Sequence, residues 1–177
     1  VEEGTTNLLP SPHLSGTKGI SLVHLGEEDG YQKYGLSGTW SQGSYPYCIR
    51  IRDVNFAGGV QYSASLQVKT NVPNKFATLF SGIHYVNRPL ASSGHASRVL
   101  LSNGDILVKI EGFAYVDATS QGGYIGLRPA SDGTTFYPET DFIWAKAQVE
   151  QKPFATSFVD GSRGSGIVDI PVQYTSS

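Results

Sequence analysis

Polar and apolar residues alternate with a period of two in several stretches of this chain, which is the pattern of β-strands with one buried face. The clearest example is Val60–Lys69, where Val, Tyr, Ala, Leu and Val occupy every second position and polar residues lie between them. Phe142–Val149 alternates in the same way and should end before Pro153, which has no amide hydrogen for a central strand. Ile106–Val116 is the third long strand, and a phase slip in its alternation predicts a β-bulge near Gly112.

Shorter strands and turns fill most of the remaining chain. The dipeptide Asn103-Gly104 predicts a hairpin between Arg98–Leu101 and the strand that begins at Ile106, since both residues tolerate positive φ. Gly26–Gly38 and Val86–Ser97 are rich in polar residues and Gly, and each is predicted to be mainly a loop. Further short strands are expected at Ile20–Leu25, Cys48–Ile51, Phe76–Tyr85 and Tyr124–Leu127.

No stretch combines an apolar stripe of helical period with the capping residues of an ordinary helix. Roughly eight or nine strands separated by turn signals instead predict an all-β fold, an antiparallel β-sandwich. The buried face of Val60–Lys69 should supply part of its core, so Leu66 is predicted to lie inside the sandwich.

The two ends of the chain carry motifs that belong together. Asn7–Pro10 reads Asn-Leu-Leu-Pro, and Ala147–Glu150 is followed shortly afterwards by Pro153–Val159, which reads Pro-Phe-Ala-Thr-Ser-Phe-Val. With these motifs in this order, the chain resembles carbohydrate-binding-module-like (galactose-binding-like) β-sandwich domains. Such domains occur in phage tail and tail-fibre proteins and in large bacterial surface proteins. The resemblance implies a jelly-roll-like arrangement of the strands and a non-catalytic role in carbohydrate binding.

The resemblance also implies a biological setting. Domains of this kind act in adhesion, receptor binding and host cell attachment, so the expected partner is a cell-surface glycan and the expected location a virion tail or the cell surface. Residues 1–160 would form the module, and residues 161–177 a linker and the start of a following element. Because the chain also begins without Met, we expect further domains in a longer parent chain. A homo-oligomer is compatible with this setting, and in a tail fibre it would be a trimer.

The composition narrows the classes of partner. The net charge is −2 and charged residues make up 16% of the chain, so no basic surface for nucleic acid is expected. No apolar run approaches the roughly 18 residues of a membrane span, so no membrane insertion is expected. The single cysteine, Cys48, cannot form an intrachain disulfide and is interpreted as a small buried residue in a strand.

Aromatic side chains are the feature that points to a ligand, with 10 Tyr, 8 Phe and 2 Trp. Flat aromatic rings stack on the apolar faces of sugar rings, while neighbouring amides and hydroxyls bond the sugar hydroxyls. The segment Trp40–Tyr47 holds Trp40, Tyr45 and Tyr47 among Gly, Pro and Ser, so these rings are the predicted ligand contacts. Trp144, in the closing strand, is their predicted companion. The alternative is that each ring fills the core, as large aromatic residues usually do.

Catalytic chemistry finds little support in the sequence. The 4 histidines are scattered without metal-ligand spacing, and neither a Gly-x-Ser-x-Gly elbow nor a phosphate-binding loop is present. The acidic run Glu27–Asp29 is interpreted as a solvated loop rather than a catalytic carboxylate pair. We therefore assign no catalytic residues and expect no enzyme activity.

A structural calcium ion is the one cofactor that the resemblance suggests. The candidate oxygen ligands are Glu2, Glu3, Asp141 and Glu150, but no compact loop of alternating Asp residues supports a site. Three functions are therefore weighed for the chain. The first is adhesion to a cell-surface glycan, the second is a structural or oligomerising module of a tail or fibre without its own ligand, and the third is a glycan-cleaving enzyme.

Overall fold

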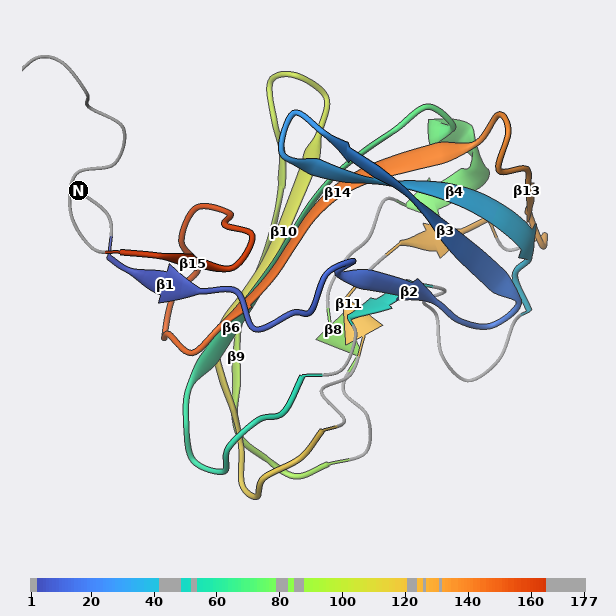
Figure 1. The fold of residues 1–177 in the computed structure, drawn as a ribbon. Coiled ribbons are helices and arrows are strands. Elements are labelled where there is room, and N and C mark those ends of the chain that lie inside the picture. Colours follow the sequence, from blue (N-terminus) through green and yellow to red (C-terminus); the bar gives the residue numbers. More distant parts are fainter. Residues whose placement is uncertain are drawn as a thin grey trace, which may run out of the picture.

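A large antiparallel sheet dominates the computed structural model, which describes residues 3–41, 49–51, 54–78, 83–84, 88–120, 124–125, 127–130 and 132–164 (Figure 1). In these residues the sheet has seven strands: β3 (Ile20–Glu28), β4 (Tyr31–Thr39), β6 (Tyr62–Thr70), β9 (Leu90–Leu100), β10 (Ile106–Tyr115), β13 (Thr135–Phe136) and β14 (Phe142–Glu150). β4 pairs with β3 on one side and with both β13 and β14 on the other. The order then continues from β14 through β6 and β10 to β9, so β3 and β9 are the edge strands.

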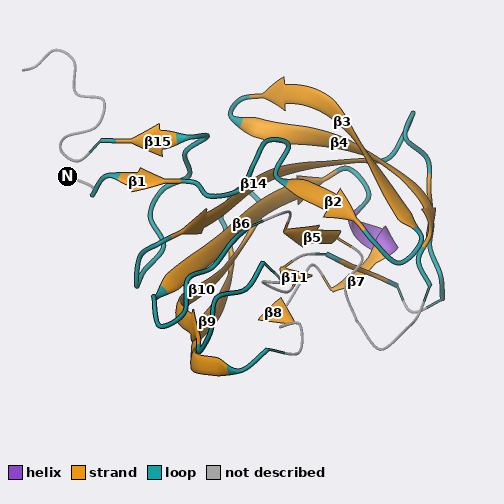
Figure 2. Cartoon of the chain, turned by 60° about the horizontal axis from the view of Figure 1, so that its bottom comes forward, coloured by secondary structure: helices purple, strands orange, loops and turns teal. Residues whose placement is uncertain are grey.

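Short antiparallel strand pairs form the rest of the fold. They are β1 (Thr5–Thr6) with β15 (Ser162–Arg163), β2 (Leu14–Gly16) with β5 (Ile49–Ile51), β7 (Phe76–Thr78) with β12 (Arg128–Pro129), and β8 (Ile83–His84) with β11 (Tyr124–Ile125). Figure 2 shows β2, β5, β8 and β11 gathered on one side of the large sheet. Within the described residues the only helix is a 3₁₀ turn, η1 (Pro73–Lys75). The chain is therefore an all-β, antiparallel sandwich, as the alternation of the sequence predicted.

The core lies between the large sheet and the short pairs. Leu66 of β6 is 1% exposed, and Val108 and Ala147, its register partners on β10 and β14, are buried beside it. Every second residue of these strands points into this layer, because successive side chains of a strand leave opposite faces of the sheet. The prediction that Leu66 lies inside is confirmed. We call this side of the large sheet the inner face and the opposite side the outer face.

Two local predictions of the sequence also hold. The register between β10 and β6 shifts between Ile110 and Phe113, and Gly112 adopts a φ of +75° in that bulge. Residues 101–105 turn between β9 and β10, and Gly104 has a φ of +91° there. In both places glycine provides a left-handed conformation that a side chain would strain.

The predicted loop at residues 26–38 is wrong. The structure has a long hairpin here, in which β3 and β4 pair from Ile20 opposite Gly38 to Glu28 opposite Tyr31. Its turn is Asp29-Gly30, with φ values of +52° and +78°, which is the Asp-Gly signature of a tight hairpin. Glycine and charged residues along the strands masked the alternation on which the prediction depended.

The predicted loop at residues 86–97 is wrong for its larger part, because β9 begins at Leu90 and pairs with β10 over its whole length. Most side chains of β9 are exposed, so its sequence carries no alternation of polar and apolar positions. An edge strand of this kind is held by the ladder of its single neighbour and not by burial. Its polar composition therefore hides it from a pattern-based prediction.

The two terminal motifs lie side by side. The Asn7 side chain donates to the carbonyls of Ala147 (3.0 Å) and Val159 (3.1 Å), and its oxygen accepts from the amide of Val149 (3.1 Å). Leu9 is buried in the core. Residues 162–163, which were predicted to open a linker, pair with β1 in the structure, whereas residues 165–177 lie outside the described residues.

Candidate functional site

The outer face of the large sheet carries polar side chains in register across three strands. Gln67 of β6 lies opposite Lys146 of β14 on one side and Leu107 of β10 on the other. One row further along, Ser65 lies opposite Lys109 on β10. Because these residues alternate with the core residues, all of them leave the sheet on its outer face. They form a floor of amide, hydroxyl and ammonium groups together with one apolar side chain, that of Leu107.

Residues 153–159, which we call the crossing segment, run over one end of this floor. Three outer-face side chains hold the backbone of this segment. Glu111 accepts from the amide of Ala155 (2.7 Å), and Gln148 accepts from the amide of Val159 (2.7 Å). Glu150, fully buried, accepts from the amide of Thr156 (3.0 Å). The closing motif therefore covers part of the outer face by specific hydrogen bonds rather than by apolar packing.

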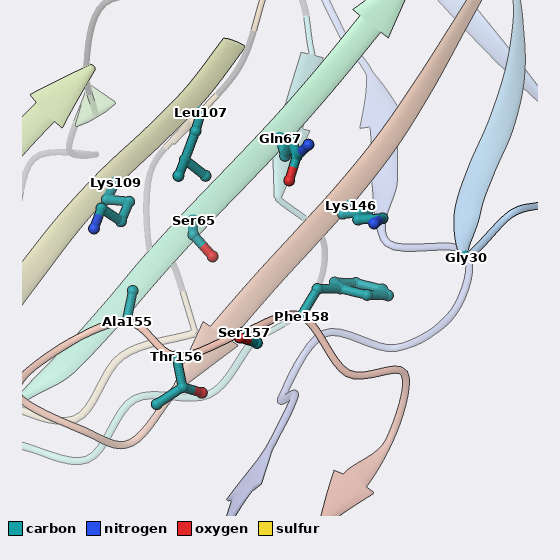
Figure 3. A pocket seen from close by; sticks show the side chains of 10 residues that line it. All are labelled: Gly30, Ser65, Gln67, Leu107, Lys109, Lys146, Ala155, Thr156, Ser157 and Phe158. Atoms are coloured by element: carbon teal, nitrogen blue, oxygen red, sulfur yellow. The ribbon is translucent and has the colours of Figure 1, made fainter. Parts of the chain in front are cut away.

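Floor and crossing segment enclose a groove of about 660 Å³, which we call the outer groove (Figure 3). Ten residues line it: Gly30, Ser65, Gln67, Leu107, Lys109, Lys146, Ala155, Thr156, Ser157 and Phe158. Figure 3 shows the floor side chains standing on three neighbouring strands and the crossing segment passing beside them. The lining offers hydroxyl, amide and ammonium groups together with one aromatic ring.

An aromatic and cationic cluster lies on the outer face next to this groove. The rings of Phe142 and Trp144 are 5.9 Å apart, and the ammonium of Lys33 lies 4.4 Å from the centre of the Phe142 ring. The ammonium groups of Lys146 and Lys69 lie 4.3 Å and 4.6 Å from the centre of the Tyr31 ring. Lys146 belongs to this cluster and to the outer groove, so the two form a continuous surface.

The Tyr31 hydroxyl is the centre of a small buried network. It donates to Asp105 (2.6 Å) and accepts from the amide nitrogen of Gln67 (2.8 Å), which also donates to Asp105 (3.1 Å). Burial, followed by the hydrogen bond to Asp105 and its negative charge, raises the pKa of Tyr31 far above its usual range. The hydroxyl therefore stays neutral, and it fixes the Gln67 side chain at the floor of the groove.

Taken together, these groups can bind a polar ligand by hydrogen bonds on a rigid surface. Ser65 offers a hydroxyl, Gln67 an amide oxygen and Lys146 an ammonium, and all three line the outer groove. Sites built on strands hold their groups more firmly than sites on loops. Polar groups that converge beside aromatic rings on a concave surface are typical of a binding site for a small molecule or a sugar.

The structure separates the predicted ligand residues. Trp40 is 6% exposed and belongs to the core, so its ring offers no open face to a sugar. Trp144 is partly exposed on the outer face, beside Phe142. Tyr45 and Tyr47 lie outside the described residues. The predicted grouping of Trp40 with Trp144 is therefore not present, because one ring points into the core and the other away from it.

The candidate calcium ligands do not form a common site. Glu3 pairs with Lys152 (2.7 Å), and Asp141 pairs with Lys75 and accepts from the amide of Tyr137 (3.0 Å). Glu150 is occupied by the crossing segment and by the Thr5 hydroxyl (2.7 Å), and Glu2 lies outside the described residues. In the described part of the chain, no three His, Cys, Asp or Glu side chains come together as metal ligands. The three described carboxylates have cationic, hydroxyl or amide partners and do not fit a calcium ion.

Two of the histidines have defined local partners. His13 is buried and bonds to Asp160 (3.2 Å), and its ring meets that of Phe158 edge to face. Burial lowers the pKa of His13, while the neighbouring Asp160 raises it in part. His24 bonds to Gln32 on the adjacent strand.

The polar faces of two strands were a signal in the sequence for the outer groove. Two strands with clear alternation, β6 and β14, carry bulky or charged residues on the face away from the core, among them Gln67, Lys69 and Lys146. A plain solvated face would account for those residues as well. Only the register and the path of the crossing segment show that they surround a groove.

No protein-family model matches the chain, and no curated protein matches it in sequence. The resemblance to carbohydrate-binding modules therefore rests on the terminal motifs. The 3₁₀ turn η1, which is the helical part of the described residues, is far too short to cross a bilayer.

Proposed function

We propose that the chain is a non-catalytic carbohydrate-binding and adhesion module of a phage tail or bacterial surface protein, which binds a cell-surface glycan at the outer groove. The observation that supports this most strongly is the groove itself, which is open, built on paired strands and lined by hydroxyl, amide and ammonium groups. Trp144 and Phe142 extend the same surface with aromatic rings. The terminal motifs, on which the resemblance depends, support the same class of function.

The groove is a better candidate than the segment at residues 40–47. Trp40 is committed to the core, and a sugar ring stacks on an aromatic face only when that face is open. On the outer face, by contrast, the floor groups are held in register by ladder hydrogen bonds. A ligand that binds there orders few protein groups, which reduces the entropic cost of association.

A glycan array probed with the chain, followed by titration of any bound glycan, tests this proposal. The diagnostic variant is Ala155→Tyr, which fills the groove from the crossing segment while keeping the backbone bond to Glu111. It should abolish glycan binding and leave the thermal midpoint unchanged. The matched control is Ala96→Tyr, because Ala96 is exposed and shares the inner face with its register partner Ile110. An array without any bound glycan would overturn the proposal, and full affinity in Ala155→Tyr would remove the outer groove as the site.

A structural module remains the second candidate because apolar side chains are exposed on both edge strands of the large sheet. Val23 and Leu25 are exposed on β3, and Val99 and Leu100 on β9. Edge strands with apolar side chains can pair with further chains. Sedimentation equilibrium tests this alternative: a stable oligomer that Leu25→Lys converts to a monomer, without loss of glycan binding, would support assembly at this edge.

A further inference from the structure

Lysine is concentrated on the outer face of the large sheet. The chain has seven lysines, and four of them, Lys33, Lys69, Lys109 and Lys146, occupy outer-face positions of β4, β6, β10 and β14. The net charge of the whole chain is −2, so this concentration is local. A cationic surface on an otherwise slightly acidic protein attracts anionic ligands to one place.

Three of these lysines are without an anionic partner. Lys33, Lys69 and Lys146 form no hydrogen bond and no ion pair with any residue that the structure describes, whereas Lys109 lies 3.9 Å from Glu111. Aromatic rings hold these three ammonium groups in place instead. Lys69 and Lys146 both lie over the Tyr31 ring, so two positive charges are anchored to one side chain. Like charges on neighbouring side chains repel, and an anion bound at this surface would reduce that cost.

The carboxylates near this surface are committed to other partners. Asp105 is buried and accepts from Tyr31, Gln67 and Asn103. Glu111 and Glu150 hold the crossing segment. None of these acids forms an ion pair with Lys33, Lys69 or Lys146, so these three ammonium groups remain available to an external anion.

Lys146 connects this charge to the outer groove. It lines the groove next to Gln67, its register partner, and its ammonium lies over Tyr31. A sugar ring in the groove would have the Ser65 hydroxyl and the Gln67 amide oxygen for its own hydroxyls, and an acidic group on that sugar would reach Lys146. Ammonium–anion hydrogen bonds are stronger than those between neutral groups.

We propose that the glycan bound at the outer face is acidic, a carbohydrate that carries carboxylate or sulfate groups, with Lys146 and Lys69 binding the anion. This inference rests on the proposed function and specifies its ligand class. Uronic acids and sulfate esters present the same chemistry, a sugar ring with an attached anion. A phospholipid surface is also anionic, but it has no sugar hydroxyls beside its anionic group. It therefore lacks the part of the ligand that would bind the polar groups of the groove.

Titration of the whole chain with paired polysaccharides tests the proposal. Polygalacturonate is compared with its fully methyl-esterified form, and dextran sulfate with dextran. The acidic member of at least one pair should bind about tenfold tighter or more than its neutral counterpart, and added salt should weaken the complex. The first pair detects carboxylate recognition and the second sulfate recognition. Equal affinity within both pairs, or no binding of either acidic polymer, overturns the inference.

Two variants of the cationic cluster and one control complete the experiment. Lys146→Gln and Lys69→Gln should each weaken binding of the acidic polymer about tenfold, because each removes a charged contact. Neither lysine makes a hydrogen bond in the described residues, and each variant loses only a ring contact, so their thermal midpoints should change little. The control is Arg98→Gln, an exposed cation that lies opposite Val108 and so belongs to the inner face. Unchanged affinity in both lysine variants overturns the assignment of the anion site.

The experiments distinguish a wrong ligand class from a wrong module function. If the glycan array shows binding, but only neutral glycans bind, the module function stands and the acidic ligand class is wrong. If no glycan binds at all, both are wrong. Phosphatidylserine vesicles serve as the non-sugar polyanion, and vesicle binding as tight as that of the acidic polysaccharides overturns the assignment to a glycan.

Discussion

Leu66 and Gln67 are neighbours in β6, yet their side chains serve opposite faces of one sheet. On the inner face, Leu66 is surrounded by apolar side chains of the adjacent strands. On the outer face, Gln67 belongs to a hydrogen-bond network with Tyr31 and Asp105 at the floor of a groove. The inner face is stabilised by burial of apolar area, which has no preferred direction, whereas the outer face depends on directional bonds between particular groups.

The outer face itself divides into two parts. Beneath the crossing segment it is as buried as the core, since Gln148 and Glu150 have no exposed surface and bond to that segment. Beyond the segment, around Trp144 and the lysines, it is open. The difference shows that a polar face can supply both a structural contact and a binding surface, depending on what covers it. Substitutions on the inner face should therefore alter stability, and those on the open outer face should alter binding.

The largest expected effect is that of Trp40→Ala on the inner side. Removing this buried ring should lower the free energy of unfolding by about 3–5 kcal/mol, because a large cavity remains in the core. Urea unfolding followed by circular dichroism measures the change. Trp40→Phe, which keeps an aromatic ring, should cost less. A midpoint unaffected by Trp40→Ala would return this residue to the set of possible ligand contacts.

Leu66→Ala should have the second-largest effect on the free energy of unfolding. The side chain is 1% exposed and lies between two buried register partners, so its truncation should cost about 2–5 kcal/mol. Thermal unfolding by calorimetry measures this loss. The volume-conserving change Leu66→Met should cost less than about 1.5 kcal/mol, and a smaller loss for Ala than for Met would contradict the assignment to the core.

Glu150→Gln tests the covered part of the outer face. The carboxylate accepts hydrogen bonds from Thr5 and from the amide and hydroxyl of Thr156, and an amide cannot accept all of them. The expected loss is about 1.5–3 kcal/mol, the range for hydrogen bonds to a charged group. Limited proteolysis should also cut within residues 152–160 more rapidly. A stable variant with unchanged cleavage would mean that other contacts suffice to hold the crossing segment.

Trp144→Ala tests the open part of the outer face. Once an array has supplied a bound glycan, this change should weaken the complex by about 1–3 kcal/mol, as truncations of central aromatic contacts do. Isothermal titration calorimetry gives the affinity, and Leu100→Ala, at an exposed position of edge strand β9, is the control. If both variants bind as tightly as the parent, the ligand does not reach Trp144.

The smallest expected effect is a pH dependence that originates at His13. Burial lowers its pKa in the folded protein, so between that value and the ordinary value of about 6.5 the unfolded chain binds more protons. The free energy of unfolding should therefore fall as the pH drops below about 6.5, and this contribution should level off below the folded pKa. Denaturant unfolding at about pH 7.5 and about pH 5.5, on either side of the usual histidine pKa, measures this change in the free energy of unfolding. His13→Gln should remove this part of the slope, and an identical slope in the variant would assign it to other groups.

The sequence predicted the strands that have one apolar and one polar face, and it missed the strands whose two faces are similarly polar. The long strands β6, β10 and β14 were recognised because one face is apolar, and β10 kept its predicted bulge at Gly112. The hairpin at residues 20–39 and edge strand β9 were not recognised at full length, because exposed strands lack a regular alternation of polar and apolar residues. Pattern-based prediction detects burial, and backbone pairing without burial leaves no such pattern.

The candidate site was predictable only in its parts. The alternation of Phe142–Val149 puts Trp144 on the face opposite Ile143 and Ala145, and in the structure that face points away from the core. Trp40 has the same side chain and lies next to a Gly- and Ser-rich segment, yet it packs into the core. Strand alternation assigns a face to Trp144 but not to Trp40, because the part of the sandwich that covers the Trp40 ring is decided by the tertiary structure.

By itself, the sequence determined the all-β class, the core residues of the long strands and the polar character of their other face, since side-chain alternation is a local property of the backbone. The tertiary structure alone decided where a groove exists. It brought Lys69 and Lys146 to the ring of Tyr31, from three strands that are distant in the chain, and it placed the crossing segment over Gln148 and Glu150. Such contacts depend on strand order and register, which are set by packing of the whole sandwich and carry no mark in any one segment.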